Sequence, residues 1–118
     1  MRNLLKTFKA LSDETRLRIL NLLMERECCV CEVMQALDIS QSRASRNLGV
    51  LYDAGFLKSR RDGVWTVYDI DRETLRQYLP QLANIVRNEL KGSRETNMDL
   101  ERLKTAERVG PGCAECSK

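Results

Sequence analysis

Three of the five cysteines fall within four consecutive positions, Cys28, Cys29 and Cys31, in the stretch RECCVCEVMQAL. Crowded thiols serve either as ligands for soft metal ions or as redox groups. The N-terminal sequence lacks the apolar run of a signal peptide, so we expect a cytoplasmic protein whose thiols stay reduced rather than forming structural disulfides. The cluster therefore predicts a soft-metal or a redox site, and Cys113 and Cys116 form a second thiol pair near the end of the chain.

Helices must position this cluster, because apolar residues recur at helical spacing through the first 37 residues. Two helices are predicted before the cysteines, the second of them capped by Ser12. A third helix carries an apolar stripe of Val30, Val33, Met34 and Leu37. The thiols are thus predicted to lie where this third helix begins.

A fourth helix is predicted between Ser40, which caps it, and Gly55, which ends it. One side of this helix is apolar, and the opposite side carries small polar residues and one long cation. The short helix, a turn and this longer helix make a helix-turn-helix candidate, in which the second helix enters the DNA major groove. The side chains expected to contact DNA from it are those of Ser40, Gln41, Ser42, Arg43, Ser45 and Arg46.

A β-hairpin is predicted next, because FLKSRRDGVWTVYDI is rich in strand-forming residues and is divided by Asp62 and Gly63, a typical pair at a two-residue turn. Arg60 and Arg61 lie beside the tip, where cations reach phosphates or the minor groove. The net charge of the whole chain is only +3, yet residues 38–61 carry five bases against two acids. The basic excess therefore falls on the two elements that would face DNA.

The rest of the chain is predicted to hold a dimerisation helix and a tail. Helical apolar spacing continues from Asp71 to Leu90, where Pro80 is expected to introduce a kink, and a chain of 118 residues has a small core that dimerisation would enlarge. We expect residues 1–92 to form one DNA-binding and dimerisation domain. Residues 93–118 are expected to form a charged, flexible tail with one loose helix near 95–108. The alternative for the long helix is a place in the core of a single chain.

The segments ALSDETRLRILNLL, CVCEVMQALDISQSRASRNLGVLYDAGFL and RRDGVWTVYDI occur in this order. Over roughly residues 1 to 90 they resemble the winged-helix metalloregulators of the ArsR type, in the arsenic-responsive branch. The resemblance implies a mainly α fold with a β-hairpin wing, a dimeric winged helix-turn-helix. It also implies a homodimeric repressor, not an enzyme and not a membrane protein, that binds double-stranded operator DNA and releases it when As(III) or Sb(III) binds cysteine thiolates.

The resemblance also implies which thiols bind the metalloid. The arsenic branch has a Cys-Val-Cys motif flanked by acids, and this chain matches it with Cys29 and Cys31. Some members place a third cysteine where this chain has Met34, so we expect Cys28 to be the third ligand. An ideal helix would project Cys29 and Cys31 about 200° apart, so their sulfurs would converge only if the first turn unwinds.

Alternatives remain for the third ligand and for the inducer. Cys113 and Cys116 are possible accessory ligands, although ordering a tether costs entropy that a local thiol avoids. Cd(II) and Pb(II) also suit thiolates, so a repressor of the same fold that senses these ions is the main alternative. A thiol redox sensor and a structural zinc module are further alternatives. The chain has no histidine, the ligand that zinc, nickel and cobalt sensors of this family use. The sequence leaves the physiological inducer and the operator sequence open.

Overall fold

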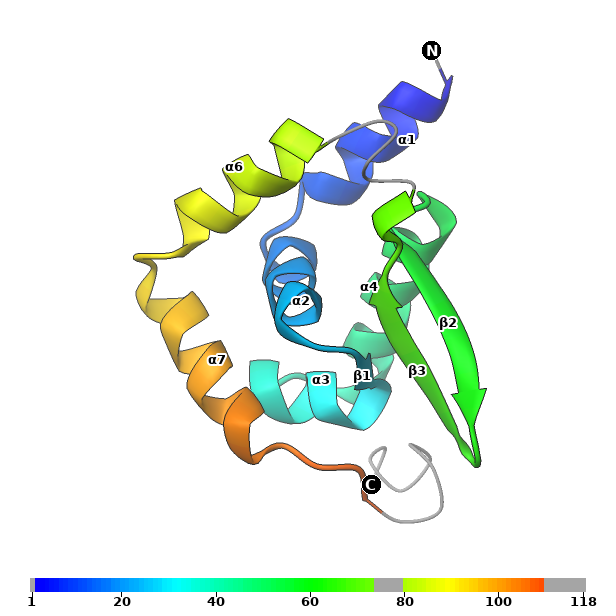
Figure 1. Cartoon of the computed structure of the whole chain (residues 1–118), viewed down its shortest axis with the longest axis vertical. Helices are drawn as coiled ribbons and strands as arrows, with labels where there is room; N and C mark the ends of the chain where they lie inside the picture. The colour runs from blue at the N-terminus through cyan, green and yellow to red at the C-terminus, as the bar shows by residue number, and fades with distance from the viewer. Residues whose placement is uncertain (1, 74–79, 110–118) are drawn as a thin grey trace.

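The computed structural model describes residues 2–73 and 80–109. The described elements are α1 (Arg2–Leu11), α2 (Glu14–Glu25), β1 (Cys28–Cys29), α3 (Val30–Leu37), α4 (Gln41–Asp53), β2 (Leu57–Asp62), β3 (Trp65–Ile70), α6 (Pro80–Leu90) and α7 (Arg94–Thr105). Helices dominate, and the strands form one small antiparallel sheet in the order β1-β3-β2. This is the predicted winged helix-turn-helix, with α3 and α4 as its two helices and the β2–β3 hairpin as its wing (Figure 1).

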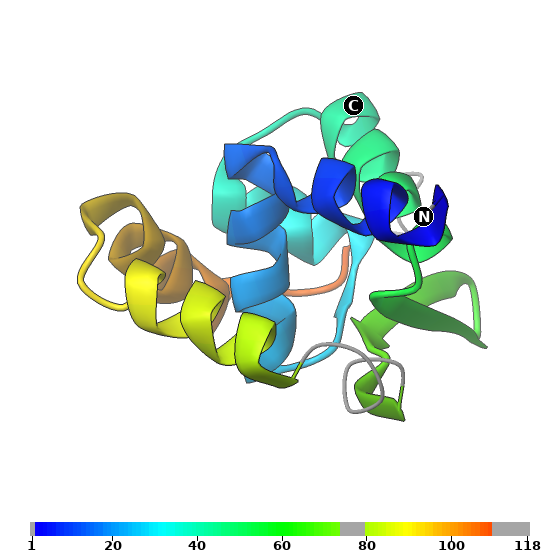
Figure 2. The same cartoon turned by 90° about the horizontal axis from the view of Figure 1, so that it is seen from above.

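Helix α2 forms the centre of the molecule. It packs against α1, α3, α4, α6, α7 and strand β3, and Figure 2 shows α6 and α7 on one side of it and the hairpin on the other. Its most buried side chains include Ile19, Leu22 and Leu23. The cap of this helix is Asp13, whose carboxylate accepts from the backbone N–H of Arg16 at 3.0 Å. The expected Ser12 cap is therefore wrong by one residue.

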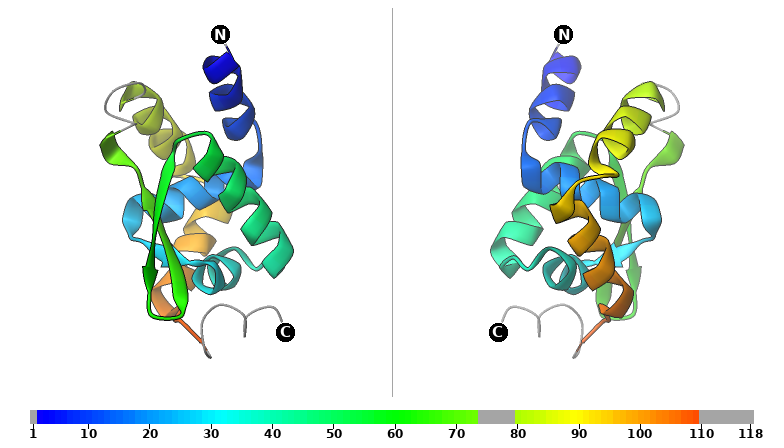
Figure 3. Two further views of the ribbon diagram at one scale, coloured as in Figure 1. Left: turned by 90° about the vertical axis from the view of Figure 1, so that its right-hand side faces the viewer. Right: turned by 90° about the vertical axis from the view of Figure 1, so that its left-hand side faces the viewer.

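The wing is a hairpin whose register differs by one residue from the predicted turn. Asp62 pairs with Trp65, so the two central turn residues are Gly63 and Val64 rather than Asp62 and Gly63. Gly63 has φ +63°, and a two-residue turn with Gly first tolerates this left-handed value without strain. The hairpin lies beside α4 (Figure 3), and Val64 at its tip is 53% exposed.

The segment predicted to be a flexible tail folds back on the domain through residue 109. Helix α7 packs against α2 and α3, and Leu103 belongs to the hydrophobic core. Asp99 is fully buried and pairs in a bidentate way with Arg18, at 2.7 Å to Nε and 2.6 Å to Nη2. The predicted loose helix is therefore docked, because a buried carboxylate and an apolar face tie it to the core. Residues 110–118 lie outside the described part.

The predicted dimer interface is described only in part. On α1, Leu5 and Phe8 are each 51% exposed, and such apolar side chains on a helix face suit a partner surface. The predicted stripe of Leu75, Leu79 and Leu82 lies outside the described residues or side chains, as does the segment just before Pro80 in which a kink would occur. Across the described helices, none combines the length and the apolarity that crossing a bilayer requires.

Candidate metal centre and nucleic-acid interface

The sulfur atoms of Cys29 and Cys31 lie together at the start of α3. Cys29 has extended backbone angles, φ −83° and ψ 171°, and is the N-cap of α3 rather than a residue within it. Cys31 is the second residue of the helix, and the two Sγ atoms are 2.7 Å apart with both residues fully buried. The expectation that these sulfurs converge only after the first turn unwinds is therefore wrong. The change from strand to helix between them already brings them together.

Glu32 fixes this change of backbone direction. Its Oε1 accepts from the backbone N–H of Cys29 at 2.8 Å, as the fourth residue of a capping box does. Glu32 is only 4% exposed, and the guanidinium of Arg26 compensates the charge of its carboxylate at 2.8 Å. Arg108 approaches the same carboxylate at 3.8 Å. The backbone that carries the thiols is thus held by a buried carboxylate that pairs with two partly exposed arginines.

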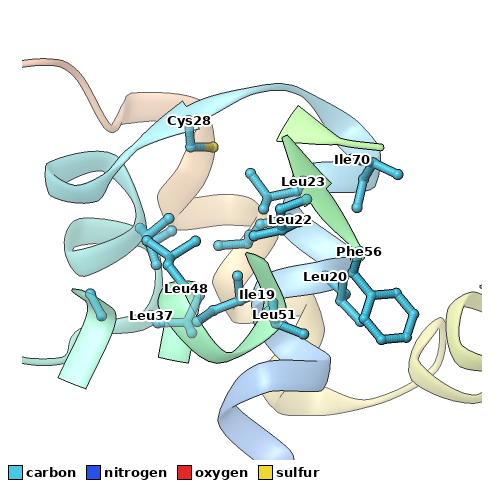
Figure 4. Close-up of a cluster of buried hydrophobic side chains, with 14 of the residues drawn as sticks. Ile19, Leu20, Leu22, Leu23, Cys28, Leu37, Leu48, Leu51, Phe56 and Ile70 are labelled. Atoms are coloured by element: carbon cyan, nitrogen blue, oxygen red, sulfur yellow. The ribbon is translucent and has the colours of Figure 1, made fainter. Parts of the chain in front are cut away.

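Cys28 faces away from the other two thiols. Successive residues of a strand point to opposite sides, and Cys28 lies in the hydrophobic cluster near Leu22 and Leu23 (Figure 4). Burial raises the pKa of its thiol to about 12, so it stays protonated at neutral pH. In the described ranges, no three cysteine or carboxylate side chains converge as a possible metal site. The structure thus brings together Cys29 and Cys31 and leaves Cys28 apart.

The chemistry of the pair suits a soft ion. Two thiols that are already adjacent form a chelate when they lose their protons, and thiolates select soft metals and metalloids over hard cations. The absence of histidine from the whole chain removes the imidazole that borderline ions often use. The predicted accessory cysteines, Cys113 and Cys116, lie outside the described residues.

Two residues of this network were not singled out from the sequence. Arg26 and Arg108 both approach Glu32, although 82 residues separate them along the chain. Cys29 and Glu32 have the spacing of a capping box with cysteine in place of serine, so that contact carries a sequence signal. No such signal marks Arg108, because it lies in a charge-rich segment whose apolar residues show no regular spacing.

The helix-turn-helix presents α4 as its outward helix. The turn after α3 passes through Asp38, which adopts a left-handed conformation at φ 56°, and Ser40 caps α4 by accepting from the N–H of Arg43 at 3.2 Å. Ser42 and Arg46 are exposed. The guanidinium of Arg46 forms no hydrogen bond or ion pair with the residues that the structure describes. Its charge is therefore available to a partner.

Other predicted contacts on α4 are partly engaged within the protein. Gln41 donates to the hydroxyl of Ser45 at 2.8 Å, and Arg43, although exposed, donates to Thr15 at 3.1 Å. Asn47 is buried, and its amide oxygen accepts from Arg16 at 3.0 Å. Asn47 thus anchors α4 to α2, which places it on the inner side of the helix.

The two wing arginines differ in their surroundings. Arg60 forms ion pairs with Glu27 and, at 3.8 Å, with Asp62. Arg61 is exposed and forms no ion pair with the other residues that the structure describes. Since neighbouring strand residues point to opposite faces, only one of them faces its own carboxylates. Arg61 is therefore the freer of the two cations.

Comparison with known proteins shows which family the helix-turn-helix region resembles. The family model described as bacterial regulatory protein, arsR family, matches residues 13–59. The chain is 48% identical over 65 residues to the arsenical resistance operon repressor of Escherichia coli. This match covers 54% of this chain and 56% of that protein. It is 41% identical to a cadmium resistance transcriptional regulatory protein CadC homolog of Staphylococcus aureus, over 61% of this chain and 60% of that one. The chain thus spans little more than half the length of these relatives.

Among solved structures, the chain is similar to a homodimeric winged helix-turn-helix DNA-binding domain from Mycobacterium bovis, described as a possible ArsR-family transcriptional regulator. The match has a TM-score of 0.65 and 28% identity, and it covers 79% of this chain and 82% of that one. The architecture derived from the helices and the wing is therefore shared with a DNA-binding domain.

Proposed function

Because the chain belongs to the arsR family of bacterial regulatory proteins, we propose that it is a transcriptional repressor controlled by a metalloid. It binds double-stranded operator DNA as a homodimer in the cytoplasm. It releases the operator when As(III) or Sb(III) binds the thiolates of Cys29 and Cys31. No catalytic step is part of this function.

The observation that carries the proposal is the distance of 2.7 Å between the Cys29 and Cys31 sulfurs, at the start of the helix before α4. Relatives are named arsenic or arsenical resistance regulators, and a chelating pair of thiols is a suitable ligand set for a soft metalloid. A turn of three residues separates α3 from α4. A displacement of α3 is therefore passed directly to the helix that faces DNA.

The thiol pair also adjoins the wing. Cys29 pairs with Val67 in the β1–β3 ladder, and Val67 pairs in turn with Arg60 of β2. Cys29 belongs to the sheet of the wing and Cys31 belongs to the helix-turn-helix. An ion bound by both thiolates ties these two units together in a new relative position. Metalloid and operator then oppose each other through the backbone, without touching each other.

The test is a titration of a labelled operator duplex, followed by fluorescence anisotropy with and without As(III). A coupling free energy of about 1 to 3 kcal/mol weakens operator binding by about 5- to 150-fold in the wild-type protein. Cys29→Ser and Cys31→Ser should bind the operator as the wild type does and should not release it with As(III). Cys28→Ala is the matched control and should release it fully. Full release by the Cys29→Ser, Cys31→Ser double variant would refute the site.

The same titration ranks the inducers. A cadmium resistance regulator is among the relatives, and two thiolates also suit Cd(II) and Pb(II). As(III) and Sb(III) should release the operator at lower concentrations than Cd(II) or Pb(II). Release by Cd(II) or Pb(II) alone would make the chain a repressor for those ions instead.

A further inference from the structure

The residues that follow α7 lie against α3 and form what we call the C-terminal strap, residues 106–109. Ala106 leaves the helix in an extended conformation, with φ −70° and ψ 139°. Gln35 of α3 binds the backbone of Glu107 twice: its amide N–H donates to the carbonyl at 2.6 Å, and its amide oxygen accepts from the backbone N–H at 3.1 Å. Arg26 donates to the carbonyl of Ala106 at 3.4 Å. The strap is therefore fixed to the helix that begins at the thiol pair.

Arg108 of the strap contacts the tip of the wing. Its guanidinium donates to the carboxylate of Asp62 at 2.6 Å and lies 5.6 Å from the centroid of the Trp65 ring. Asp62 and Trp65 pair with each other next to the turn, so one side chain contacts both strands of the hairpin. A charged hydrogen bond and a cation over an indole ring are both favourable. The strap therefore anchors the wing tip as well as α3.

The same guanidinium approaches the thiol site. Its Nε lies 3.8 Å from Oε1 of Glu32, and this oxygen also accepts from the backbone N–H of Cys29 at 2.8 Å. Glu32 is 4% exposed, so its carboxylate is held by these groups and by Arg26 rather than by water. A single carboxylate oxygen thus lies between the backbone of Cys29 and the side chain that holds the wing tip.

An ion bound by both thiolates displaces these groups. The sulfurs of Cys29 and Cys31 are 2.7 Å apart, whereas two sulfurs that share one ion through bonds of about 2.3 Å, as in tetrahedral zinc sites, lie more than about 3 Å apart. Cys29 is fully buried, and a close-packed interior leaves its side chain little room to move without its backbone. A bound ion therefore acts on Glu32 through the N–H of Cys29.

We propose that Arg108 is a positioning residue of the metalloid response, because it passes the state of the thiol pair from Glu32 to the wing tip. This inference deepens the proposed function and rests on it. Arg60 and Arg61 directly precede Asp62 on β2, so a shift of the tip changes where these cations meet DNA phosphates. The turn between α3 and α4 moves one element that faces DNA, and the strap moves the other.

The test measures the coupling factor, which is the ratio of operator affinity without and with saturating As(III), by fluorescence anisotropy on the full chain. Arg108→Ala should lower this factor several-fold, because the wing tip no longer follows the thiol site. Asp62→Ala, which keeps the contact between Arg108 and Glu32, should lower it in the same way. Lys104→Ala is the matched control: it removes one positive charge from an exposed pair with Glu101 and should keep the wild-type factor.

The fluorescence of Trp65 gives a second readout that requires no DNA. Trp65 is the single tryptophan of the chain, and Arg108 lies over its ring. As(III) should change its emission in the wild type. Arg108→Ala should still bind As(III), measured by calorimetry, but should lose most of this change in emission. A residue that only stabilised the fold would lower the melting temperature and leave both readouts as they are in the wild type.

The outcomes separate this inference from the proposed function. If As(III) does not release the operator from the wild type, the proposed function fails, and the inference fails with it. If As(III) releases the operator from the wild type and from Arg108→Ala by the same factor, only the inference is overturned. It is also overturned if Trp65 emission responds equally in both proteins, or if Arg108→Ala no longer binds As(III).

Discussion

The thiol site and the surface that we propose faces DNA are built in opposite ways. Cys29 and Cys31 are fully buried, and the backbone that carries them is held by Glu32 and two arginines. Arg46 on α4 and Arg61 on the wing are exposed, and their guanidinium groups have no hydrogen-bond or ion-pair partner among the described residues. The fold thus prepares the proposed sensing site in advance and leaves the two cations of the proposed DNA-facing surface free for phosphates and bases.

The two regions are joined at short range. The three-residue turn between α3 and α4 connects them on one side, and the pairing of β1 with β3 connects them on the other. A rigid buried site and a free surface that share these elements can respond to each other without a long pathway. Substitutions confined to one region therefore test how far the other depends on it.

The largest effect is expected from Asp99→Ala, which removes the support of α7 behind the thiol site. Asp99 is fully buried and its two oxygens bind Arg18. Loss of one partner of a buried ion pair typically costs about 3 to 5 kcal/mol, because the other charge stays buried. Urea denaturation should show this loss in the free energy of unfolding. Glu101→Ala removes an exposed pair with Lys104 and should change it by less than about 1 kcal/mol. Equal effects would refute the anchoring role of Asp99.

Arg46→Ala should disturb only the DNA-facing surface. If the free guanidinium binds a base edge with two hydrogen bonds, its loss costs about 1 to 3 kcal/mol of operator affinity and reduces sequence preference. As(III) affinity should stay unchanged, since Arg46 forms no hydrogen bond or ion pair with the described residues of the thiol site. Arg94→Ala, at an exposed position of α7, makes the same change in charge and serves as the control. Operator binding that is equal in both variants would remove α4 from the interface.

An effect of intermediate size is expected from the buried thiol of Cys28, which should make the stability of the protein depend on pH in the alkaline range. Burial raises the pKa of its thiol from 9.0 to about 12, so the folded state holds a proton that the unfolded state loses first. Below about pH 9 the thiol is protonated in both states, and its burial contributes fully to stability. As pH rises from about 9 toward 12, the unfolded state loses the proton first, and the free energy of unfolding falls by up to about 1.4 kcal/mol per pH unit. Across this pH range, the free energy of unfolding should fall more steeply for the wild type than for Cys28→Val. Parallel curves would show that Cys28 ionises freely.

The smallest effect separates the two wing arginines. Arg61→Ala should weaken binding evenly across DNA sequences and reduce the slope of log affinity against log salt by about one. Arg60→Ala should change that slope less, because Glu27 and Asp62 already neutralise its charge. The measurement is operator binding at several salt concentrations. A larger change for Arg60 would mean that DNA binding breaks these ion pairs.

Local patterns in the sequence predicted most of the fold. Apolar spacing predicted α2, α3 and α4, and strand-forming residues on both sides of Gly63 predicted the wing. The docking of α7 was missed because Asp99 and Arg18 are 81 residues apart, and no local pattern records such a pair. The contacts of Arg108 with Glu32 and Asp62 were missed for the same reason, since these residues are also far apart in the sequence.

The sequence predicted which cysteines form the thiol cluster, but it did not predict how their sulfur atoms are arranged. The spacing of Cys29 and Cys31 suggested sulfurs on opposite sides of a helix, whereas strand pairing with Val67 keeps Cys29 extended. That pairing depends on a strand 38 residues further along the chain. The orientation of Cys28 toward the core follows from the same strand. Tertiary contacts therefore decided which thiols meet.

The most direct test of the account measures the coupling in the reverse direction. The affinity of the protein for As(III) is determined by calorimetry, first alone and then with saturating operator duplex. Binding free energies couple reciprocally, so the operator should weaken As(III) binding by the same factor, about 5- to 150-fold, by which As(III) weakens operator binding. The Cys29→Ser variant should show no such coupling. As(III) affinity that is unchanged by the operator would contradict the claim that the thiol pair and the DNA-facing surface compete through α3.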